Sequence, residues 1–461
     1  MSGSAPLTGM PTPGTPRAYE FPHATRRTLA NGVRVVSASM HKVPLVTVSL
    51  IFPSAGAGHD PPGREGLAQL TAAMLVEGTT LLDGAALTER FEALGSSLTS
   101  SADWDAGALS FTVHPSRLDD AVALVRDVVL HPAFPARELA RIQEEHRADR
   151  LQVMAEPRAL ADCAFIWECY DGRTRYRRPV DGTTESVGAI TRDDVHACWR
   201  SAYGTNDMAI VIAGDIDDAR ARAVTESLTR DAIGGGTAPF TLAAAPRRTS
   251  RAISLVDRAG APQAELRVGH VAVSRAHPAY HELTVMNAVL GGLFSSRINL
   301  NLRERHGYTY GAFSGFDWRT GPGPWAVRTA VNTEACAPAV QEILSEIERI
   351  RSEPVDQSEL ALAVDYLVGV FPLRFESTAA VASALAAQSI YGLADDFYDA
   401  YRSRIGSVSA EALRRVAREH LRPDDLQIVV VGDADRVRPS LESLGAGPIH
   451  GEAAEQIERA P

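Results

Sequence analysis

Two histidines four residues apart, His277 and His281, have the residue type and spacing of a metal site. Imidazoles at this spacing share one face of a helix and can bind one ion together. Pro278, however, suits the first position of a helix, where its missing N–H is not needed. His281 would then face solvent one turn later, so we do not expect this pair to hold a metal.

An arginine and a tyrosine seven residues apart, Arg303 and Tyr310, lie in the segment 291–311, GGLFSSRINLNLRERHGYTYG. Gly307 would end a helix in the left-handed conformation, which places Arg303 near the helix end and Tyr310 on a following strand. Taken alone, Arg303 could be a surface arginine favoured by the helix dipole and Tyr310 an ordinary strand aromatic. The elements expected around them are a helix with the apolar stripe Leu283, Met286, Leu290 and Leu293, a second helix capped by Ser295 or Ser296, and a strand in which Tyr308, Tyr310 and Ala312 alternate.

Other chemistry-bearing motifs are absent from the sequence. It contains no Gly-x-Ser-x-Gly, no P-loop and no dinucleotide fingerprint. The four cysteines show no Cys-x-x-Cys spacing, so we expect buried or free thiols in a reducing compartment. Their positions are Cys163, Cys169, Cys198 and Cys336.

An internal repeat organises the whole chain. The segment 209–217, AIVIAGDID, recurs at 427–435 as QIVVVGDAD, 218 residues later. The upstream segments repeat with the same offset, and Thr191 and Ser409 are expected to cap the equivalent helices. Duplication of one domain explains this pattern better than a short-period repeat architecture does.

Strand-like and helix-like segments occur in unequal runs within each half, which favours an α+β fold with helices packed on a mostly antiparallel sheet. Strands are expected at 33–36, 46–52, 252–256 and 264–268, and helices at 66–76, 83–94, 118–130 and 136–154. The expected division is a disordered arm (1–25), an N-terminal domain (26–232), a Gly-rich linker (233–248), a C-terminal domain (249–443) and a tail (444–461).

Composition excludes several function classes. With 46 basic and 57 acidic residues the net charge is −11, which argues against a nucleic-acid binder and against docking on anionic lipid. The most apolar stretch, 43–52, is too short to span a bilayer. The N-terminus does not have the pattern of a signal peptide, so we expect a cytoplasmic protein with no nucleic acid and no membrane among its partners.

The segment 66–80, GLAQLTAAMLVEGTT, resembles the zinc helix of the pitrilysin/insulinase (M16) metallopeptidases, especially the two-domain bacterial and mitochondrial-processing type. In active members this helix carries His-x-x-Glu-His, in which both imidazoles bind zinc and the glutamate acts as general base. The matching positions here are Gln69, Ala72 and Ala73.

A neutral amide is a poor zinc ligand, and alanine can neither ligate nor accept a proton. Glu144 and Glu145 come near the place of the family's third ligand, but they cannot form a site alone, and a solvated acidic helix face explains them. The degenerate motif therefore implies no metal and no cofactor in this chain.

The segment around Arg303 and Tyr310 resembles the family's Arg/Tyr motif more closely. In relatives this pair reaches across a cleft toward the zinc site, binds substrate carbonyls and stabilises the oxyanion as it forms. The resemblance covers residues 27–435 and implies catalytic roles for Arg303 and Tyr310, with Arg297 and Tyr308 structural.

Some two-domain members of the family work as pairs in which one subunit carries zinc and the other supplies Arg and Tyr. This chain resembles the second kind. The resemblance implies a clamshell half that, with a zinc-bearing partner of intact His-x-x-Glu-His, hydrolyses peptides or unfolded segments and is inactive alone. The alternative is a catalytically inactive structural or peptide-binding subunit, as in the core proteins of respiratory complexes. An active homomeric enzyme would need a metal site that the sequence does not show.

Overall fold

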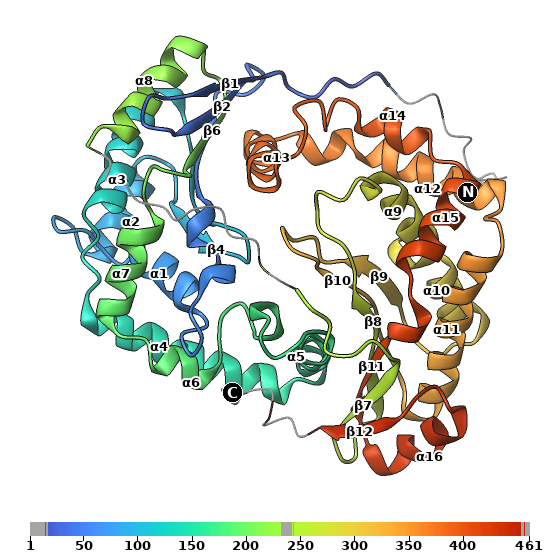
Figure 1. Ribbon diagram of the computed structural model, residues 1–461. Helices are drawn as coiled ribbons and strands as arrows, with labels where there is room; N and C mark the ends of the chain where they lie inside the picture. Colours follow the sequence, from blue (N-terminus) through green and yellow to red (C-terminus); the bar gives the residue numbers. More distant parts are fainter. Residues whose placement is uncertain (1–13, 15–16, 232–241, 243, 453–455, 457–461) are drawn as a thin grey trace, which may run out of the picture.

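The computed structural model describes residues 14, 17–231, 242, 244–452 and 456. It contains two domains side by side, each built on a six-stranded sheet with helices packed against it (Figure 1). The expected α+β class with two similar domains is confirmed. No helix in the described part of the chain is long and apolar enough to cross a bilayer.

The sheet of the first domain has the order β1-β2-β6-β3-β5-β4, and only the pair β2–β6 is parallel. Its strands are β1 (Ala24–Thr28), β2 (Arg34–Ser39), β3 (Val46–Phe52), β4 (Thr99–Ala102), β5 (Gly107–Val113) and β6 (Ala209–Gly214). The helices of this half are α1 (Leu67–Leu75), α2 (Gly84–Ala93), α3 (Leu118–Leu130), α4 (Ala136–Ala155), α5 (Pro157–Cys169), α6 (Thr184–Gly188), α7 (Arg192–Ala202) and α8 (Asp218–Thr229).

The sheet of the second domain has the order β12-β7-β11-β8-β10-β9, in which β12–β7 and β7–β11 are the parallel pairs. Its strands are β7 (Ala252–Asp257), β8 (Gln263–Val271), β9 (Ala312–Phe316), β10 (Pro324–Asn332), β11 (Gln427–Gly432) and β12 (Ile449–Glu452). The helices are α9 (Tyr280–Asn287), α10 (Arg297–Asn299), α11 (Cys336–Ser352), α12 (Gln357–Val370), α13 (Thr378–Tyr391), α14 (Tyr401–Gly406), α15 (Ala410–His420) and α16 (Ala434–Leu444), with π-helical turns η5 (Ala288–Gly292) and η6 (Leu300–Arg305).

The internal repeat is visible as equivalent strands in the two sheets. β6 and β11 are inner strands, and each lies parallel to one neighbour and antiparallel to the other. The helix before each strand has the expected cap, because Thr191 accepts a hydrogen bond from the Asp194 N–H and Ser409 accepts one from the Ala412 N–H. The two halves therefore repeat one pattern of helix cap, helix and central strand.

One helix of each domain packs on the sheet of the other domain (Figure 1). Helix α5 packs on β11 and β8 of the second sheet, and α13 packs on β6 and β3 of the first. The contact of α5 is close enough that a Cβ atom added at Gly269 of β8 would lie 2.8 Å from the Phe165 ring. Because both sheet faces are thus covered, β3 and β6 are buried along their whole length.

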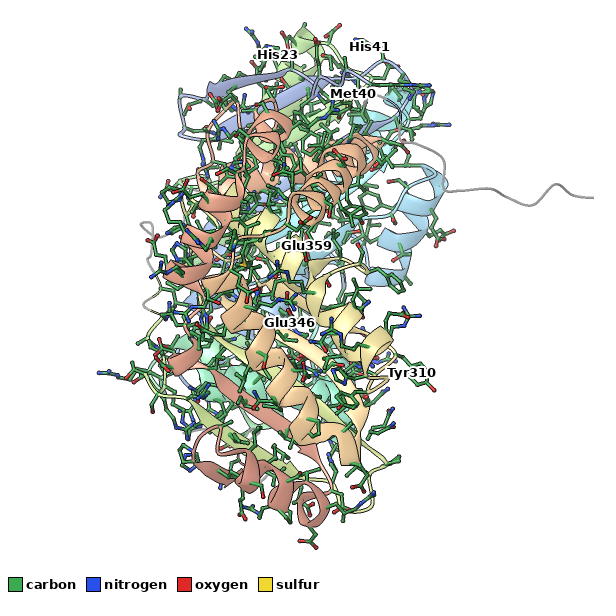
Figure 2. All side chains as sticks on the ribbon, turned by 90° about the vertical axis from the view of Figure 1, so that its right-hand side faces the viewer. His23, Met40, His41, Tyr310, Glu346 and Glu359 are labelled. Carbon is green, nitrogen blue, oxygen red and sulfur yellow. The ribbon has the colours of Figure 1, made fainter. Side chains whose placement is uncertain are left out.

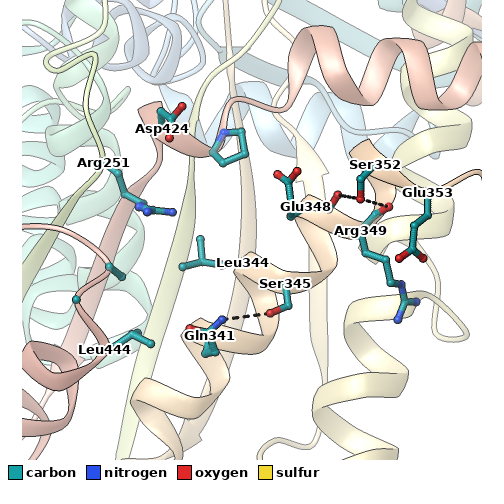
Figure 3. A pocket seen from close by; sticks show the side chains of 13 residues that line it. Arg251, Gln341, Leu344, Ser345, Glu348, Arg349, Ser352, Glu353, Asp424 and Leu444 are labelled. Carbon is teal, nitrogen blue, oxygen red and sulfur yellow. Dashed lines mark hydrogen bonds between the residues drawn. The ribbon is translucent and has the colours of Figure 1, made fainter.

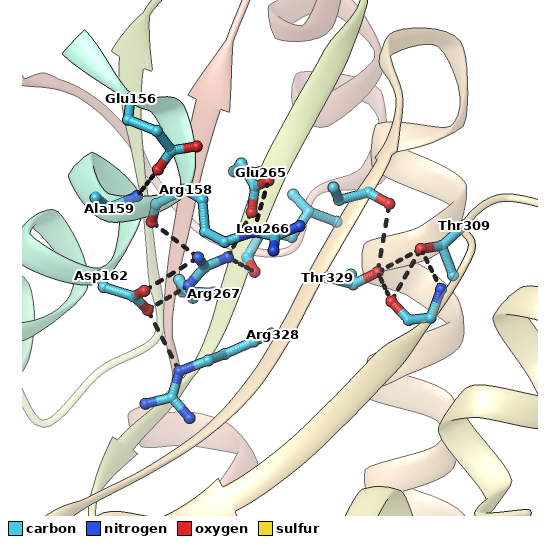
Figure 4. A network of polar contacts seen from close by, with 12 residues as sticks. Glu156, Arg158, Ala159, Asp162, Glu265, Leu266, Arg267, Thr309, Arg328 and Thr329 are labelled. Atoms are coloured by element: carbon cyan, nitrogen blue, oxygen red, sulfur yellow. Dashed lines mark hydrogen bonds and ion pairs between the residues drawn. The ribbon is translucent and has the colours of Figure 1, made fainter. Parts of the chain in front are cut away.

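An ion network around the buried Arg267 fixes α5 to the second sheet (Figure 4). The Arg267 guanidinium on β8 donates to Asp162 of α5 at 2.6 Å and to Glu265 at 2.9 Å. It also donates to the backbone carbonyl of Arg158 at 2.9 Å. Arg267 is almost fully buried, so these bonds replace the water that it loses on folding.

Both ends of the chain differ from the expected arm and tail. Phe21, inside the expected arm 1–25, is buried and packs on Phe375 and Tyr398 of the second domain. Helix α16 reaches Leu444 and β12 adds an edge strand to the second sheet, so 444–452 is not a tail. Burial of one aromatic ring and one short strand pairing explain these corrections. Residues 1–13, 15–16, 453–455 and 457–461 lie outside the described residues.

The expected linker 233–248 lies partly outside the described residues. Its described part pairs with the end of α5, because Pro246 forms an isolated β-bridge with Tyr170. Arg247 and Arg248 both contact the buried carboxylate of Glu168. This end of the segment is therefore held by the helix that crosses to the second sheet.

Candidate functional site

Helix α1 is the element that carries the degenerate motif, and its first turn is fixed by a buried carboxylate. Asp60 accepts hydrogen bonds from the backbone N–H groups of Gly66 at 2.8 Å and Ala68 at 2.9 Å. The same carboxylate pairs with Arg175 at 3.0 Å, and both side chains are almost fully buried. The positive end of the helix is thereby neutralised, which sets α1 in place.

Hydrogen bonds from two of the three motif positions, through the Gln69 side chain and the Ala72 backbone, attach α1 to β4, the edge strand of the first sheet. Gln69 donates through Nε2 to the Ala102 carbonyl at 3.1 Å, and Ser100 of β4 donates to the Ala72 carbonyl at 2.6 Å. The Ala72 methyl group is 1% exposed, and Ala73 is half-buried. The Ala72 methyl belongs to a small apolar cluster with Ala57, Ala68 and Ala102.

These residues do not fit a zinc ion. The Gln69 amide is already used in a contact with the backbone, and the two alanines offer no donor atom. Glu144 and Glu145 on α4 are exposed and pair with Arg147 and Arg141 of the same helix. In the described part of the chain no three His, Cys, Asp or Glu side chains come together as metal ligands would.

Arg303 lies in the π-helical turn η6, directly before the chain turns at Gly307, whose φ is +65°. Its guanidinium carbon stands 4.5 Å from the centre of the Phe294 ring, and its Nε lies 3.5 Å from Glu304. The side chain is 34% exposed. Its Nη1 is buried and has no hydrogen-bond partner among the described residues. Arg303 is thus held over an aromatic face in a partly exposed position, an arrangement suited to an anionic or carbonyl oxygen.

Tyr310 projects from the loop between η6 and β9, and it is 92% exposed (Figure 2). Tyr308, two residues earlier, is half-buried and stacks on His306 at 4.9 Å. A large aromatic side chain left almost fully in solvent gains little from burial, so folding does not require the Tyr310 ring. Its hydroxyl is free to contact a ligand.

The structure does not join the two sets of expected site residues. Among the described residues no hydrogen bond, ion pair or ring contact links Gln69 to Arg303 or Tyr310, nor Arg303 to Tyr310. Arg297 makes a two-bond ion pair with Glu359 of α12 at 2.7 and 2.9 Å, which agrees with its expected structural role (Figure 2 labels Glu359). The contact between Arg303 and the Phe294 ring was not predicted from the sequence, which showed only that Phe294 is part of the motif.

The histidine pair differs from expectation. His281 is buried, not exposed, because it packs against Phe397 and Tyr401. Burial, assisted by Arg404, lowers the pKa of His281 to about 4. His277 instead packs on His420, with ring centres 4.8 Å apart. The two imidazoles thus serve packing in different aromatic contacts.

A pocket of about 720 Å³ lies between α11, α16 and the turn at 423–425 (Figure 3). It is lined by charges of both signs, including Arg251, Glu348 and Asp424. None of the expected site residues lines it, and its serines, Ser345 and Ser352, bond to the Gln341 amide and to the Glu348 backbone carbonyl and not to a carboxylate. We assign no chemistry to this pocket.

Two family models match the chain. Residues 34–166 match the model described as "Insulinase (Peptidase family M16)", and residues 189–367 match the one described as "Peptidase M16 inactive domain". The chain is also similar to an uncharacterized zinc protease of Streptomyces coelicolor, with 25% identity over 412 residues, 86% of this chain and 87% of the relative. A "non-peptidase homolog" of Helicobacter pylori is 23% identical over 407 residues, 87% of this chain and 92% of that protein.

Solved structures of similar fold cover most of the chain. The structure described as "peptidase M16 inactive domain from Pseudomonas fluorescens" has a TM-score of 0.83 and 25% identity, over 89% of this chain and 98% of that one. A protease from Helicobacter pylori has a TM-score of 0.82 over 89% of this chain and 100% of that one. At 17% identity, this second likeness shows the fold alone.

Proposed function

This chain belongs to the M16 family of metallopeptidases, and on that premise we propose that it is the zinc-free subunit of a two-subunit metalloendopeptidase. Arg303 and Tyr310 act on a peptide or unfolded segment that the zinc of a partner subunit hydrolyses. Zinc and the general base come from that partner, which carries an intact His-x-x-Glu-His. We place the assembly in the cytoplasm.

The observation that carries this proposal is the contrast between the two motifs. Helix α1 has no zinc ligands at the motif positions, and the methyl group of Ala72 packs in an apolar cluster. In contrast, Arg303 is partly exposed and Tyr310 is almost fully exposed. A side chain that lies almost fully in solvent, as that of Tyr310 does, adds little to the stability of the fold, so a role in binding explains it better than a role in packing does. A guanidinium and a phenol can stabilise the oxyanion of a tetrahedral intermediate.

A catalytically inactive structural or peptide-binding subunit is the second candidate. It is supported by the similarity to a protein described as a non-peptidase homolog and by the family model described as inactive. Such a subunit would use the same exposed surface for binding alone. The two candidates differ in one measurable property, which is whether this chain raises the rate of a zinc-bearing relative.

The test uses the full chain and zinc-bearing M16 relatives from the same genome, first any encoded by a neighbouring gene. We expect the chain alone to bind no stoichiometric zinc and to cleave no peptide in a quenched fluorescent library. Mixing it with the correct relative should produce cleavage well above that of the relative alone. About one zinc per chain that survives mild chelation, or a relative with full activity unaffected by this chain, would contradict the proposal.

A further inference from the structure

Asn299 connects the segments that carry Arg303 and Tyr310. It lies in α10, and its side chain is fully buried. Its Nδ2 donates to the Phe294 carbonyl at 2.6 Å, and its Oδ1 accepts from the Ala312 N–H at 3.0 Å. A carbonyl must face a donor and an N–H must face an acceptor, so these two backbone groups fix the orientation of the amide.

The two backbone groups that Asn299 holds flank the exposed pair. Phe294 supplies the ring beneath the Arg303 guanidinium. Ala312 begins β9 two residues after Tyr310, so its N–H sets where the Tyr310 loop joins the sheet. The Phe294 ring is itself 62% exposed, and burial of the ring therefore does not account for its position. The bond from Asn299 to the Phe294 carbonyl fixes the backbone from which the ring projects.

A second set of contacts holds the Tyr310 loop from the sheet side (Figure 4). The hydroxyl oxygen of Thr329, which is buried on β10, lies 3.0 Å from the Thr309 hydroxyl and 3.0 Å from the Gly311 carbonyl. Thr309 also donates to the Gly311 carbonyl at 3.0 Å and accepts from the Gly311 N–H at 3.1 Å. Both residues adjacent to Tyr310 are thus attached to a paired strand.

We infer that Asn299 and Thr329 are positioning residues that set the placement of Arg303 and Tyr310 relative to each other. This inference rests on the proposed function, because placement matters only if the pair meets a substrate. Asn299 fixes the backbone of Phe294, whose ring lies beneath Arg303, and the end of the Tyr310 loop, and Thr329 fixes the residues on either side of Tyr310. The arrangement leaves Tyr310 in solvent and Arg303 partly exposed, while residues next to them in the motif are bonded to buried side chains.

The closing experiment compares Thr329→Val, which removes the hydroxyl with little change in volume, with Thr329→Ser, which keeps it. Thr333→Val is the matched control, because Thr333 is equally buried and donates to the Ala261 carbonyl, away from the loop. Asn299→Leu removes both amide bonds and serves as a stronger variant. Each is made in the full chain, and a melting curve confirms folding.

The first measurement is hydrogen exchange by mass spectrometry over the peptide 308–316. Thr329→Val should speed exchange of this peptide roughly two- to tenfold, the effect of one lost hydrogen bond of ordinary strength. Thr329→Ser and Thr333→Val should leave this peptide unchanged. Unchanged exchange in Thr329→Val would overturn the inference, whatever the activity.

The second measurement is the steady-state rate of the reconstituted pair. Thr329→Val should lower kcat roughly ten- to a hundredfold with a smaller change in KM. The reason is that moving a group that stabilises the transition state lowers kcat more than it weakens substrate binding. Thr329→Ser should restore the rate. Faster exchange with an unchanged kcat in an active pair would also overturn the inference. If no wild-type pair is active, the proposed function fails, and the exchange result alone decides whether these residues hold the loop.

Discussion

At the scale of single residues, the side chain of Ala72 determines that helix α1 offers no general base at this position. It fills a small space among other alanines at the position where active relatives need a general base. Tyr310 is the opposite case, because its ring contributes almost nothing to packing and its hydroxyl is available to a ligand. The chemistry expected of this chain therefore depends on the residues that its core does not use.

Tyr310→Phe tests that expectation most directly. The substitution removes one hydroxyl, and loss of an oxyanion donor typically lowers kcat about 10²- to 10³-fold. Kinetics on the reconstituted pair would measure it. The melting temperature should stay within a few degrees, because exposed substitutions usually change stability by about 0.5 kcal/mol or less. Tyr308→Phe is the control and should be mild, and full kcat/KM in Tyr310→Phe would favour the inactive subunit.

Arg303→Ala should act mainly on binding. The guanidinium is held over Phe294 and the side chain is partly exposed, which suits a contact with a ground-state carbonyl. Loss of such a uniform contact raises KM more than it lowers kcat. The same assay, run over a range of substrate concentrations, separates the two constants. A fall in kcat alone would instead assign Arg303 to the transition state.

His270 predicts a pH dependence of stability. It lies in the core beneath the turn at 422–425, where its Nδ1 is 2.9 Å from the Val271 carbonyl and its Nε2 accepts from the Arg422 N–H at 3.2 Å. Burial, assisted by Arg422, lowers the pKa of His270 to about 4. Below about pH 6.5 the unfolded chain binds a proton that the folded chain does not, so stability falls with pH until about pH 4, by at most about 1.4 kcal/mol per pH unit.

Urea unfolding at pH 7 and pH 5 measures this dependence. His270→Asn cannot titrate and should show a smaller loss between the two pH values, although it is less stable at pH 7. The exposed His23→Asn should lose as much as the wild type (Figure 2 labels His23). Equal losses in His270→Asn and the wild type would show that His270 is not held neutral.

At the scale of elements, the sequence predicted regular helices and strands better than it predicted irregular turns. The strand 46–52 and the helix 118–130 have the expected limits. In the helix the apolar periodicity is also the burial pattern, whereas the strand is buried along its whole length. In the segment 283–305 the two expected helices each end in a π-helical turn, η5 after α9 and η6 after α10. The first turn makes a close tertiary contact, because Gly291 lies so near Ser314 that a Cβ atom would be 2.4 Å from its hydroxyl. Periodicity in one segment carries no sign of such a contact.

The candidate site, too, could be predicted only in part from the sequence. Arg303 and Tyr310 could be singled out from residue type and spacing, together with a family resemblance. Phe294 beneath Arg303 and Asn299 between the two segments could not, since a buried amide reads in sequence as an ordinary helix residue. The burial of His281 depends on Phe397 and Tyr401, which are more than a hundred residues away.

Helix α1 gives a prediction about restoring the motif. The triple variant Gln69→His, Ala72→Glu and Ala73→His should be clearly less stable than the wild type and should remain inactive without a partner. Ala72→Glu forces a larger, ionisable side chain into a filled apolar space, and overpacking alone typically costs about 1–3 kcal/mol. Gln69→His also removes the bond to Ala102.

Melting curves, zinc content and a peptide assay on the triple variant measure these effects. The single variant Ala73→His is the control, because Ala73 is only half-buried and the substitution should cost less. Efficient peptide hydrolysis by the triple variant without a partner would contradict this prediction. It would show that restoring the three motif side chains is enough to make this chain an active enzyme.

At the scale of the whole molecule, the exchanged helices α5 and α13 join two similar domains into one folding unit. Separating the halves would uncover the apolar face of the second sheet that α5 covers and the face of the first sheet that α13 covers. We expect a chain cut in the glycine run 234–236 to give two fragments that do not unfold cooperatively on their own. Mixed together, they should regain a single transition, followed by circular dichroism. Cooperative unfolding of either fragment alone would contradict this.

The same exchange has a consequence for how the protein is made. The first sheet has all its strands once Gly214 leaves the ribosome, yet the helix that covers its second face ends at Tyr391, about 180 residues later. At about 5–20 residues per second, this delay is roughly 10–35 s. During that time the nascent chain carries an uncovered apolar surface, including Val211 and Ile51. We expect its yield in cells to depend on chaperones that bind nascent chains, more than the yield of a protein whose duplicated domains close independently.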